Sequence, residues 1–237
     1  LAVLVFGDEI HTIRRWNLSD IDKVSDEKFD FVLADLGVSS MQIDNPERGF
    51  TFKQDGPLDL RLDPTSGTSA AQRLRELDED ELVGLLVENS DEPYAQCIAS
   101  EIMRTFARGE TIDTTRQLYD AIARALSFLP KSEQTDMVTT SRQRCFQALR
   151  IDVNSEFEVL YAFLEKLPTV LKPGGRVAIL TFHSGEDRLV KKAFKQGVRD
   201  GVYREAARDV VRPSAQECVQ NPRARSTKMR WAIRAEE

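Results

Sequence analysis

The sequence predicts an α/β protein in which a β-sheet domain is interrupted by an all-helical subdomain. Two mainly apolar runs of β type, residues 29–34 and 176–182, flank a region whose apolar residues recur at helical spacing. A strand-type pattern on both sides of a helix-type pattern indicates one sheet domain that carries an insertion. We therefore expect residues 1–62 and 141–237 to form one mostly parallel sheet domain, and residues 63–140 to form a separate helical domain.

The N-terminal part contains three strand candidates. Residues 1–6 are an apolar run of strand type, residues 10–16 are a short second candidate, and residues 29–34 suit a buried parallel strand that ends at Asp35. Residues 41–67 are rich in Gly, Pro and Asp, and their pattern indicates a long irregular segment. Loops of this length without secondary structure are usually functional or disordered.

The helical block has start and stop signals in its sequence. Asp78 to Glu81 has the pattern of an acidic capping box. Ser90 is the expected cap of the next helix, which we expect to end at Gly109. Thr114 then opens a helix that Pro130 would stop.

The C-terminal part returns to the sheet after one more helix. A helix is expected from about Ser141, because apolar residues recur at helical spacing as far as Leu164. Residues 171–175, Leu-Lys-Pro-Gly-Gly, then predict a tight turn into the strand at 176–182. Such a turn precedes a strand in many methyltransferase sheets, and it is also an ordinary helix-to-strand connection.

The composition is that of a folded chain without a membrane span. The 237 residues are 41% hydrophobic and 30% charged, with a formal charge of −6. This balance excludes a disordered chain, and no apolar run approaches the roughly 20 residues of a transmembrane helix. Cys97, Cys145 and Cys218 are far apart. They indicate neither a disulfide framework nor a zinc site, and they favour a reducing compartment.

Positive charge is concentrated near the C-terminus. Residues 188–234 contain 13 Lys or Arg and 4 Asp or Glu, on an otherwise acidic chain. This stretch is a candidate anion-binding face, and the alternative is an ordinary solvated helix surface. Four cations and one aromatic residue within it suit contacts to phosphates and stacking on bases: Arg223, Arg225, Lys228, Arg230 and Trp231.

Two strand ends hold candidate functional side chains. Asp35 follows the first buried strand, and Gly37 behind it lets a backbone approach a ligand closely. The alternative for Asp35 is a residue that only caps a turn. His183, one of two histidines, follows the strand at 176–182. It could donate to phosphate or substrate or shuttle a proton, or it could be a structural histidine at a strand end.

Five segments together resemble one protein family. Residues 30–50, 55–63, 146–151, 181–188 and 221–226 are similar, in the same order, to motifs of the RsmH (MraW) family. The resemblance implies a Rossmann-like class I methyltransferase sheet with an inserted helical domain. It also implies a cytoplasmic enzyme that uses S-adenosylmethionine to methylate the exocyclic N4 amine of a cytidine in the decoding region of 16S rRNA, with the small ribosomal subunit as partner.

The resemblance transfers site residues onto this sequence, and it implies no metal ligand. Asp35 is the candidate catalytic residue, and Leu18, Asp35 and Gln42 are the candidate cofactor contacts. Eight further residues are candidate contacts to substrate or RNA: Arg48, Asp59, Arg61, Asp63, Arg144, His183, Arg223 and Arg225.

The sequence also departs from the family pattern. The family's glycine-rich cofactor loop and its acidic ribose-binding residue lie upstream of Leu1, and the resemblance places residues 1–6 at the end of a helix. We therefore expect the sheet to be N-terminally incomplete, and these 237 residues to bind S-adenosylmethionine poorly or not at all. Thr140 and Ser141 stand where the family has His-Pro, although Arg144 is kept, and Gly185 stands where it has Leu.

Two other functions stay open at this point. One is an RNA- or ribosome-binding module that is catalytically inactive because the glycine-rich loop is absent. The other is a methyltransferase for a small molecule, against which the basic stretch at 188–234 argues. The sequence that precedes Leu1 in the gene would discriminate between enzyme and binding module.

Overall fold

The computed structural model describes residues 2–6, 11–24, 26–51 and 54–236, with side chains from residue 16 onward. The chain divides into two compact units, the first formed by Leu1–Gly37 with Phe157–Glu237 and the second by Val38–Glu156. Residues 38–62 and 141–156 thus cluster with the helices, although the sequence pattern placed them in the sheet domain. No helix among the described residues is long and apolar enough to cross a membrane.

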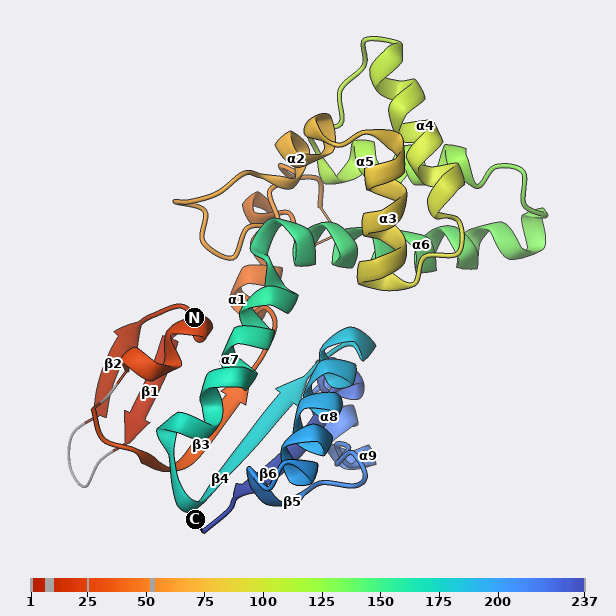
Figure 1. Cartoon of the computed structure of the whole chain (residues 1–237). Coiled ribbons are helices and arrows are strands. Elements are labelled where there is room, and N and C mark those ends of the chain that lie inside the picture. The colour runs from red at the N-terminus through yellow and green to blue at the C-terminus, as the bar shows by residue number, and fades with distance from the viewer. Residues whose placement is uncertain (1, 7–10, 25, 52–53, 237) are drawn as a thin grey trace. The chain divides into compact units, whose positions relative to one another are not determined.

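A four-stranded sheet forms the centre of the first unit (Figure 1). Its strands lie in the order β3 (Phe29–Asp35), β4 (Leu171–Thr181), β6 (Lys228–Arg234) and β5 (Tyr203–Ala206). β3 and β4 are parallel, whereas β6 is antiparallel to both of its neighbours. The described sheet is therefore mixed: β3, β4 and β5 run the same way and β6 opposes them, so the expectation of a mostly parallel sheet is confirmed only in part.

The direction of β6 follows from its connection to β5. The chain crosses from β4 to β5 through the helix α8 (Ser184–Arg199), which lets these two strands run the same way. Between β5 and β6 it forms only α9 (Ala215–Gln220) and the 3-10 helix η3 (Pro222–Ser226). Since no helix returns the chain along the sheet, β6 starts where β5 ended and must run antiparallel.

The N-terminal residues form a separate β-hairpin. β1 (Ala2–Phe6) pairs antiparallel with β2 (His11–Arg15). The two strands expected from the residue pattern are therefore confirmed. The family resemblance placed the end of a helix at residues 1–6, and this expectation is wrong for residues 2–6. In the part of the chain that the structure describes, the hairpin has no pairing with β3.

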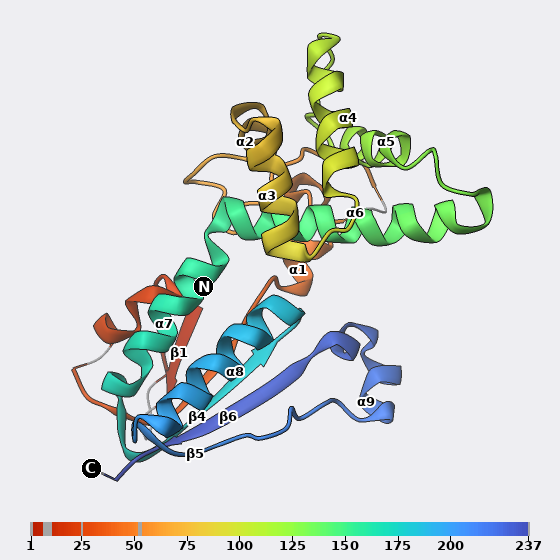
Figure 2. The ribbon, with the colours of Figure 1, turned by 45° about the vertical axis from the view of Figure 1, so that its right-hand side comes forward.

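Helices pack against the sheet of the first unit and bury its core, while Phe31 and Leu33 of β3 stay exposed. α7 (Glu156–Val170) contributes Phe163 and Leu167, which are fully buried. α8 lies alongside β4 and β6 in Figure 2 and packs on them and on β5. Its residue Gly197 allows this close packing, because a Cβ there would lie 2.4 Å from the ring of Tyr203. The short 3-10 helix η1 (Leu18–Lys23) adds Ile21 to the same core.

The helix expected from about Ser141 is in fact two helices. α6 runs from Lys131 to Asn154, and Ser155 then takes a left-handed conformation with φ of 48° before α7 begins. A non-glycine residue rarely adopts this conformation, so a continuous apolar pattern could not reveal the break. The tight turn expected at residues 171–175 lies within the bounds of β4: Gly174 has a φ of 70°, and the pairing with β3 passes from Leu171 directly to Arg176.

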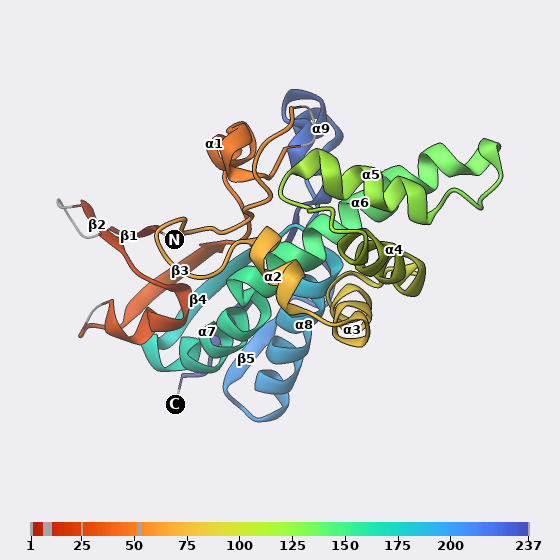
Figure 3. The same cartoon turned by 90° about the horizontal axis from the view of Figure 1, so that it is seen from above.

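The second unit is helical, with α3 packed on α4 and α6, and α4 packed on α5 (Figure 3). Before these come the shorter elements α1, η2 and α2, and the bounds are as follows: α1 (Ser40–Ile43), η2 (Pro46–Arg48), α2 (Ala70–Glu76), α3 (Glu79–Ser90), α4 (Ala95–Ala107) and α5 (Thr115–Ala125). Apolar side chains from these helices, including Leu74, Ile98 and Ile122, form one buried core. No described residue between 78 and 130 lies in a strand, as the sequence predicted.

Local helix signals were confirmed at two of the expected starts. Asp78 and Thr114 are the N-caps of α3 and α5, each in a complete capping box. The expectation for Ser90 is wrong: it is the last residue of α3, and its hydroxyl donates to the carbonyl of Leu86. Pro130 precedes α6 rather than ending α5 directly.

Candidate active site

Asp35 is the last residue of β3, at the carboxyl edge of the parallel strand pair. It lies opposite Leu180 of β4, and the next residue, Leu36, donates its N–H to the Leu180 carbonyl. β4 ends one residue later at Thr181, and the chain then passes through His183 into α8. The two strand ends singled out in the sequence therefore meet at one edge, as expected for neighbouring parallel strands.

Glu186 is a buried carboxylate beside this edge that the sequence pattern did not single out. Its residue is only 3% exposed, and Oε2 accepts the backbone N–H of Phe182 at 2.9 Å. The other oxygen, Oε1, lies 3.4 Å from Nε2 of His183. The sequence indicated Glu186 only by its position, as a Glu in the first turn of a helix that follows a strand.

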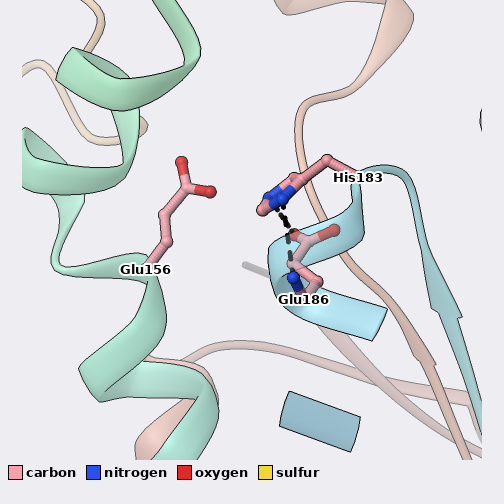
Figure 4. A group of neighbouring side chains, drawn as sticks. All are labelled: Glu156, His183 and Glu186. Atoms are coloured by element: carbon pink, nitrogen blue, oxygen red, sulfur yellow. Dashed lines mark hydrogen bonds and ion pairs between the residues drawn. The ribbon is translucent and has the colours of Figure 1, made fainter. Parts of the chain in front are cut away.

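His183 has the structural role that the sequence left open for it. It is the N-cap of α8, and its Nδ1 accepts the backbone N–H of Glu186 at 3.5 Å (Figure 4). Its ring also packs against that of Phe157, with the centroids 5.9 Å apart. These contacts fix the imidazole beside the Glu186 carboxylate and hold the first turn of α8 at the edge of the sheet.

The environment of Asp35 favours its protonated form more than water does. Partial burial raises the pKa of the Asp35 carboxyl above its usual value, and the negative charge of Glu186 raises it further. Asp35 is nevertheless exposed, so its carboxyl remains accessible to a ligand. An accessible acceptor next to a buried carboxylate can take a hydrogen bond from an amine or a hydroxyl group.

The other two candidate cofactor contacts are engaged within the protein. Leu18 is buried in the core of the first unit. Gln42 belongs to the second unit, where its side-chain oxygen accepts the N–H of Ser39 and its nitrogen donates to the carbonyl of Leu62. Of the three residues, Asp35 alone has a side-chain group exposed at a strand end.

The candidate RNA contacts near residue 48 build an ordered loop in the second unit. Arg48 donates to the carbonyls of Arg61 and Leu62, at 2.7 and 3.0 Å. Asp59 and Arg61 form a two-point ion pair, with both N···O distances 2.8 Å. Asp63 accepts the N–H and the hydroxyl of Thr65.

Two backbone features show how tightly this loop is packed. Leu60 is buried with a φ of 62°, a conformation that a branched residue adopts only when its surroundings enforce it. Asn154, at the end of α6, donates to the Leu60 carbonyl and accepts the N–H of Leu62, both within 2.8 Å. Gly56 has no room for a side chain, because a Cβ would lie 2.2 Å from the Pro46 carbonyl oxygen.

The remaining candidates differ in how much of their surface is accessible. Arg144 is half-buried on α6, and Arg223 and Arg225 are exposed in η3. Arg230, in contrast, is only 5% exposed and forms an ion pair with Asp187, so the idea that it contacts phosphates is wrong. Lys228 lies 3.9 Å from the same carboxylate.

Comparison with known sequences identifies the family. The sequence profile described as the MraW methylase family matches residues 4–235. The chain belongs to the MraW methylase family. It is 62% identical to ribosomal RNA small subunit methyltransferase H 1 of Lachnoclostridium phytofermentans, covering 99% of this chain and 65% of the relative. The corresponding protein of Agathobacter rectalis is 60% identical, covering 100% and 68%.

A more distant member matches over nearly the same part of the chain. Ribosomal RNA small subunit methyltransferase H of Thioalkalivibrio sulfidiphilus is 40% identical, covering 97% of this chain and 77% of the relative. The chain spans about two thirds of the length of the Lachnoclostridium and Agathobacter relatives, 65% and 68%. Membership in the MraW methylase family supports a Rossmann-like methyltransferase fold for the first unit.

One departure of this chain from the family motif has a structural consequence. Gly185, where the resemblance expects Leu, lies in the first turn of α8 between two aromatic rings. A Cβ at this position would lie 2.6 Å from Cζ of Phe157 and 3.2 Å from Nδ1 of His183. The missing side chain therefore lets the Phe157 ring approach the capping histidine.

We expect Gly185→Leu to destabilise the first unit by about 1–3 kcal/mol, because it overfills the space next to Phe157. Urea unfolding monitored by tryptophan fluorescence measures this, since both tryptophans, Trp16 and Trp231, belong to the first unit. Combining Gly185→Leu with Phe157→Ala should cost less than the sum of the two single changes. An unchanged stability of the single variant would show that the ring moves aside without strain.

Glu186→Gln should lower the pKa of Asp35, because it removes the second cause of the upward shift and leaves burial. Carboxyl-carbon NMR on the protein titrated with acid gives this pKa directly. The raised pKa means that ionisation of Asp35 opposes folding, so its contribution to stability is largest below pH 3.8 and declines as the pH rises through the folded-state pKa. Glu158→Gln, an exposed change on α7, is the control and should leave the Asp35 titration unchanged.

Proposed function

We propose that the protein transfers a methyl group from S-adenosylmethionine to the exocyclic N4 amine of a cytidine in the decoding region of 16S rRNA. The observation that carries this proposal is Asp35, an accessible carboxylate at the carboxyl edge of the parallel strands β3 and β4. Family membership supports methyl transfer, and the names of the relatives support ribosomal RNA of the small subunit as the substrate.

The residues present fit the cofactor in part. The Asp35 carboxylate can accept a hydrogen bond from a polar group of S-adenosylmethionine, and burial with the nearby charge of Glu186 tunes its basicity. Leu18 lies buried in the core of the first unit, and Gln42 stiffens the start of α1 through its capping box. When bound, S-adenosylmethionine supplies a methyl group that its sulfonium centre already activates.

The chain's own task is then to position and polarise the amine. The nitrogen lone pair of a cytosine amine is delocalised into the ring, which makes it a poor nucleophile. A carboxylate that holds the amine N–H favours a more pyramidal nitrogen and stabilises the positive charge that develops there. His183 and Glu186 hold the first turn of α8 so that this edge is fixed before the substrate arrives.

The target base must leave its stack before the amine can be reached, as with other enzymes that modify bases. The loop held by Arg48, the Asp59–Arg61 pair and Asn154 is the part of the second unit that we assign to holding the RNA. Its internal hydrogen bonds fix the conformation of its backbone. Arg223 and Arg225, both exposed, are assigned to phosphate contacts.

The test is methyl transfer by the protein expressed from its complete gene. Small ribosomal subunits from a strain that lacks the modification are incubated with the protein and S-adenosylmethionine, and the digested 16S rRNA is analysed by mass spectrometry for N4-methylcytidine. Its appearance in the decoding region supports the proposal. Binding of RNA without any methylated cytidine would contradict the proposal and favour a binding module instead.

A further inference from the structure

The outer face of α8 presents a straight row of positive charges. Arg188, Lys192, Lys195 and Arg199 are all exposed, and their spacings are four, three and four residues. At about 100° per residue they lie within about 60° of one another around the helix. At about 1.5 Å per residue, the row extends for about 16 Å along the helix axis.

The opposite face of α8 fixes the direction of this row. Val190, Phe194 and Gly197 are buried against the sheet of the first unit, and they lie on the far side of the helix from the row. Because that face is anchored, α8 cannot rotate to bring other side chains outward. The row is therefore a permanent feature of the surface, which we call the α8 basic row: Arg188, Lys192, Lys195 and Arg199.

The α8 basic row lacks the acidic residues that usually alternate with basic ones on a solvated helix surface. No Asp or Glu occurs between residues 188 and 199, although acidic residues outnumber basic ones in the chain as a whole, 39 to 33. In the part of the chain that the structure describes, Lys192 and Lys195 take part in no ion pair. The helix dipole favours a cation only in the last turn, so it accounts for Arg199 and not for these two lysines.

The row also begins beside the candidate active site. Arg188 lies two residues after Glu186, in the turn of α8 that follows the one capped by His183. From there the row leads away from the carboxyl edge of β3 and β4, along which Asp35 lies. A polyanion that places one unit at Asp35 can therefore continue along the outer face of α8 within the same unit of the protein.

We propose that the α8 basic row binds the phosphate backbone of the RNA strand that adjoins the target nucleotide. The inference rests on the proposed function, since it assigns a backbone track to the same substrate. Lysines and arginines that contact only phosphates add affinity and register without reading the base sequence. The row would thus hold the flanking strand while Asp35 acts on the target base.

The test compares two variants that remove the same number of charges. Lys192→Gln with Lys195→Gln alters the row, and Arg104→Gln with Lys131→Gln alters exposed positions of the second unit. Fluorescence anisotropy with a short labelled single-stranded RNA gives the affinity at a series of salt concentrations. We expect the row variant alone to reduce the slope of log affinity against log salt, by about 0.7 for each phosphate that is no longer neutralised, hence about 1.4.

The outcomes separate this inference from the proposed function. Equal slopes for the two variants overturn the assignment of the row and leave rRNA methylation standing. A reduced slope in the row variant, together with no methylated cytidine from the unchanged protein, supports the row and contradicts methylation. If the row variant loses binding to phosphatidylserine vesicles but binds RNA normally, the row is a membrane contact and the inference is wrong.

Discussion

Replacing Asp35 with Asn is expected to lower the single-turnover rate of methyl transfer by about 10²–10³-fold, the usual effect of removing one group that stabilises developing charge. An amide keeps the size of the side chain but lacks the negative charge that the proposed mechanism requires. The measurement uses the protein from its complete gene, saturating S-adenosylmethionine and small ribosomal subunits. The exposed position of Asp35 means that the substitution itself should leave the fold intact.

The same variant shows which reacting group Asp35 contacts. If titration calorimetry gives an unchanged dissociation constant for S-adenosylmethionine while the rate falls, Asp35 acts on the cytosine amine. If the affinity falls with the rate, it holds the cofactor. Asp30→Asn, on the same strand and exposed, is the matched control and should keep the rate. A near-normal rate for Asp35→Asn would show that Asp35 only terminates β3.

The position of the candidate site was predictable because it depends on local pattern and one general rule. Apolar runs at 29–34 and 176–182 marked β3 and the C-terminal part of β4, and the ends of neighbouring parallel strands meet at one edge. That rule brought Asp35 and His183 together from residues far apart in sequence. The capping boxes at Asp78 and Thr114 were predictable for a similar reason, since each involves residues only three apart.

The features that were not predictable depend on distant partners or on rare backbone conformations. The break between α6 and α7 occurs at Ser155 in the left-handed region, which no side-chain pattern announces. The direction of β6 depends on how residues 207–227 turn, and not on the composition of the strand. The position of Glu186 was not predictable either, because its burial beside His183 requires β4 and α8 to be folded together.

Arg230 shows most clearly how a tertiary contact changes the meaning of a sequence motif. In the sequence it is one of four neighbouring cations, which favoured contact with phosphates. In the structure its guanidinium donates to Asp187, 43 residues earlier in the chain, through Nε at 2.7 Å and a second nitrogen at 3.2 Å. The pair joins β6 to the first turn of α8, and both side chains are largely buried, at 7% and 16% exposure.

We therefore expect Asp187→Ala to destabilise the first unit by about 3–5 kcal/mol, because it leaves the Arg230 guanidinium buried without its counter-charge. Urea unfolding monitored by the fluorescence of Trp16 and Trp231 reports on this unit, since no other tryptophan exists in the chain. Asp30→Ala, which breaks the exposed pair with Lys172, is the matched control and should cost less than about 1 kcal/mol.

A double variant separates the loss of an ion pair from the loss of a side chain. Asp187→Leu with Arg230→Met replaces both charges by apolar groups and should restore most of the stability, because the Arg230 guanidinium is then no longer buried without its counter-charge. Acid titration gives a second check. Burial raises the pKa of Asp187, but the hydrogen bond and the positive charge of Arg230 outweigh it, so the pKa lies below the usual 3.8. The pair therefore stabilises the fold above pH 3.8, and its contribution should disappear as the pH falls through that lowered pKa. This loss is expected in the unchanged protein and not in the double variant.

If Asp187→Ala were no more harmful than Asp30→Ala, the pair would contribute nothing, and Arg230 would again be a candidate for contact with RNA.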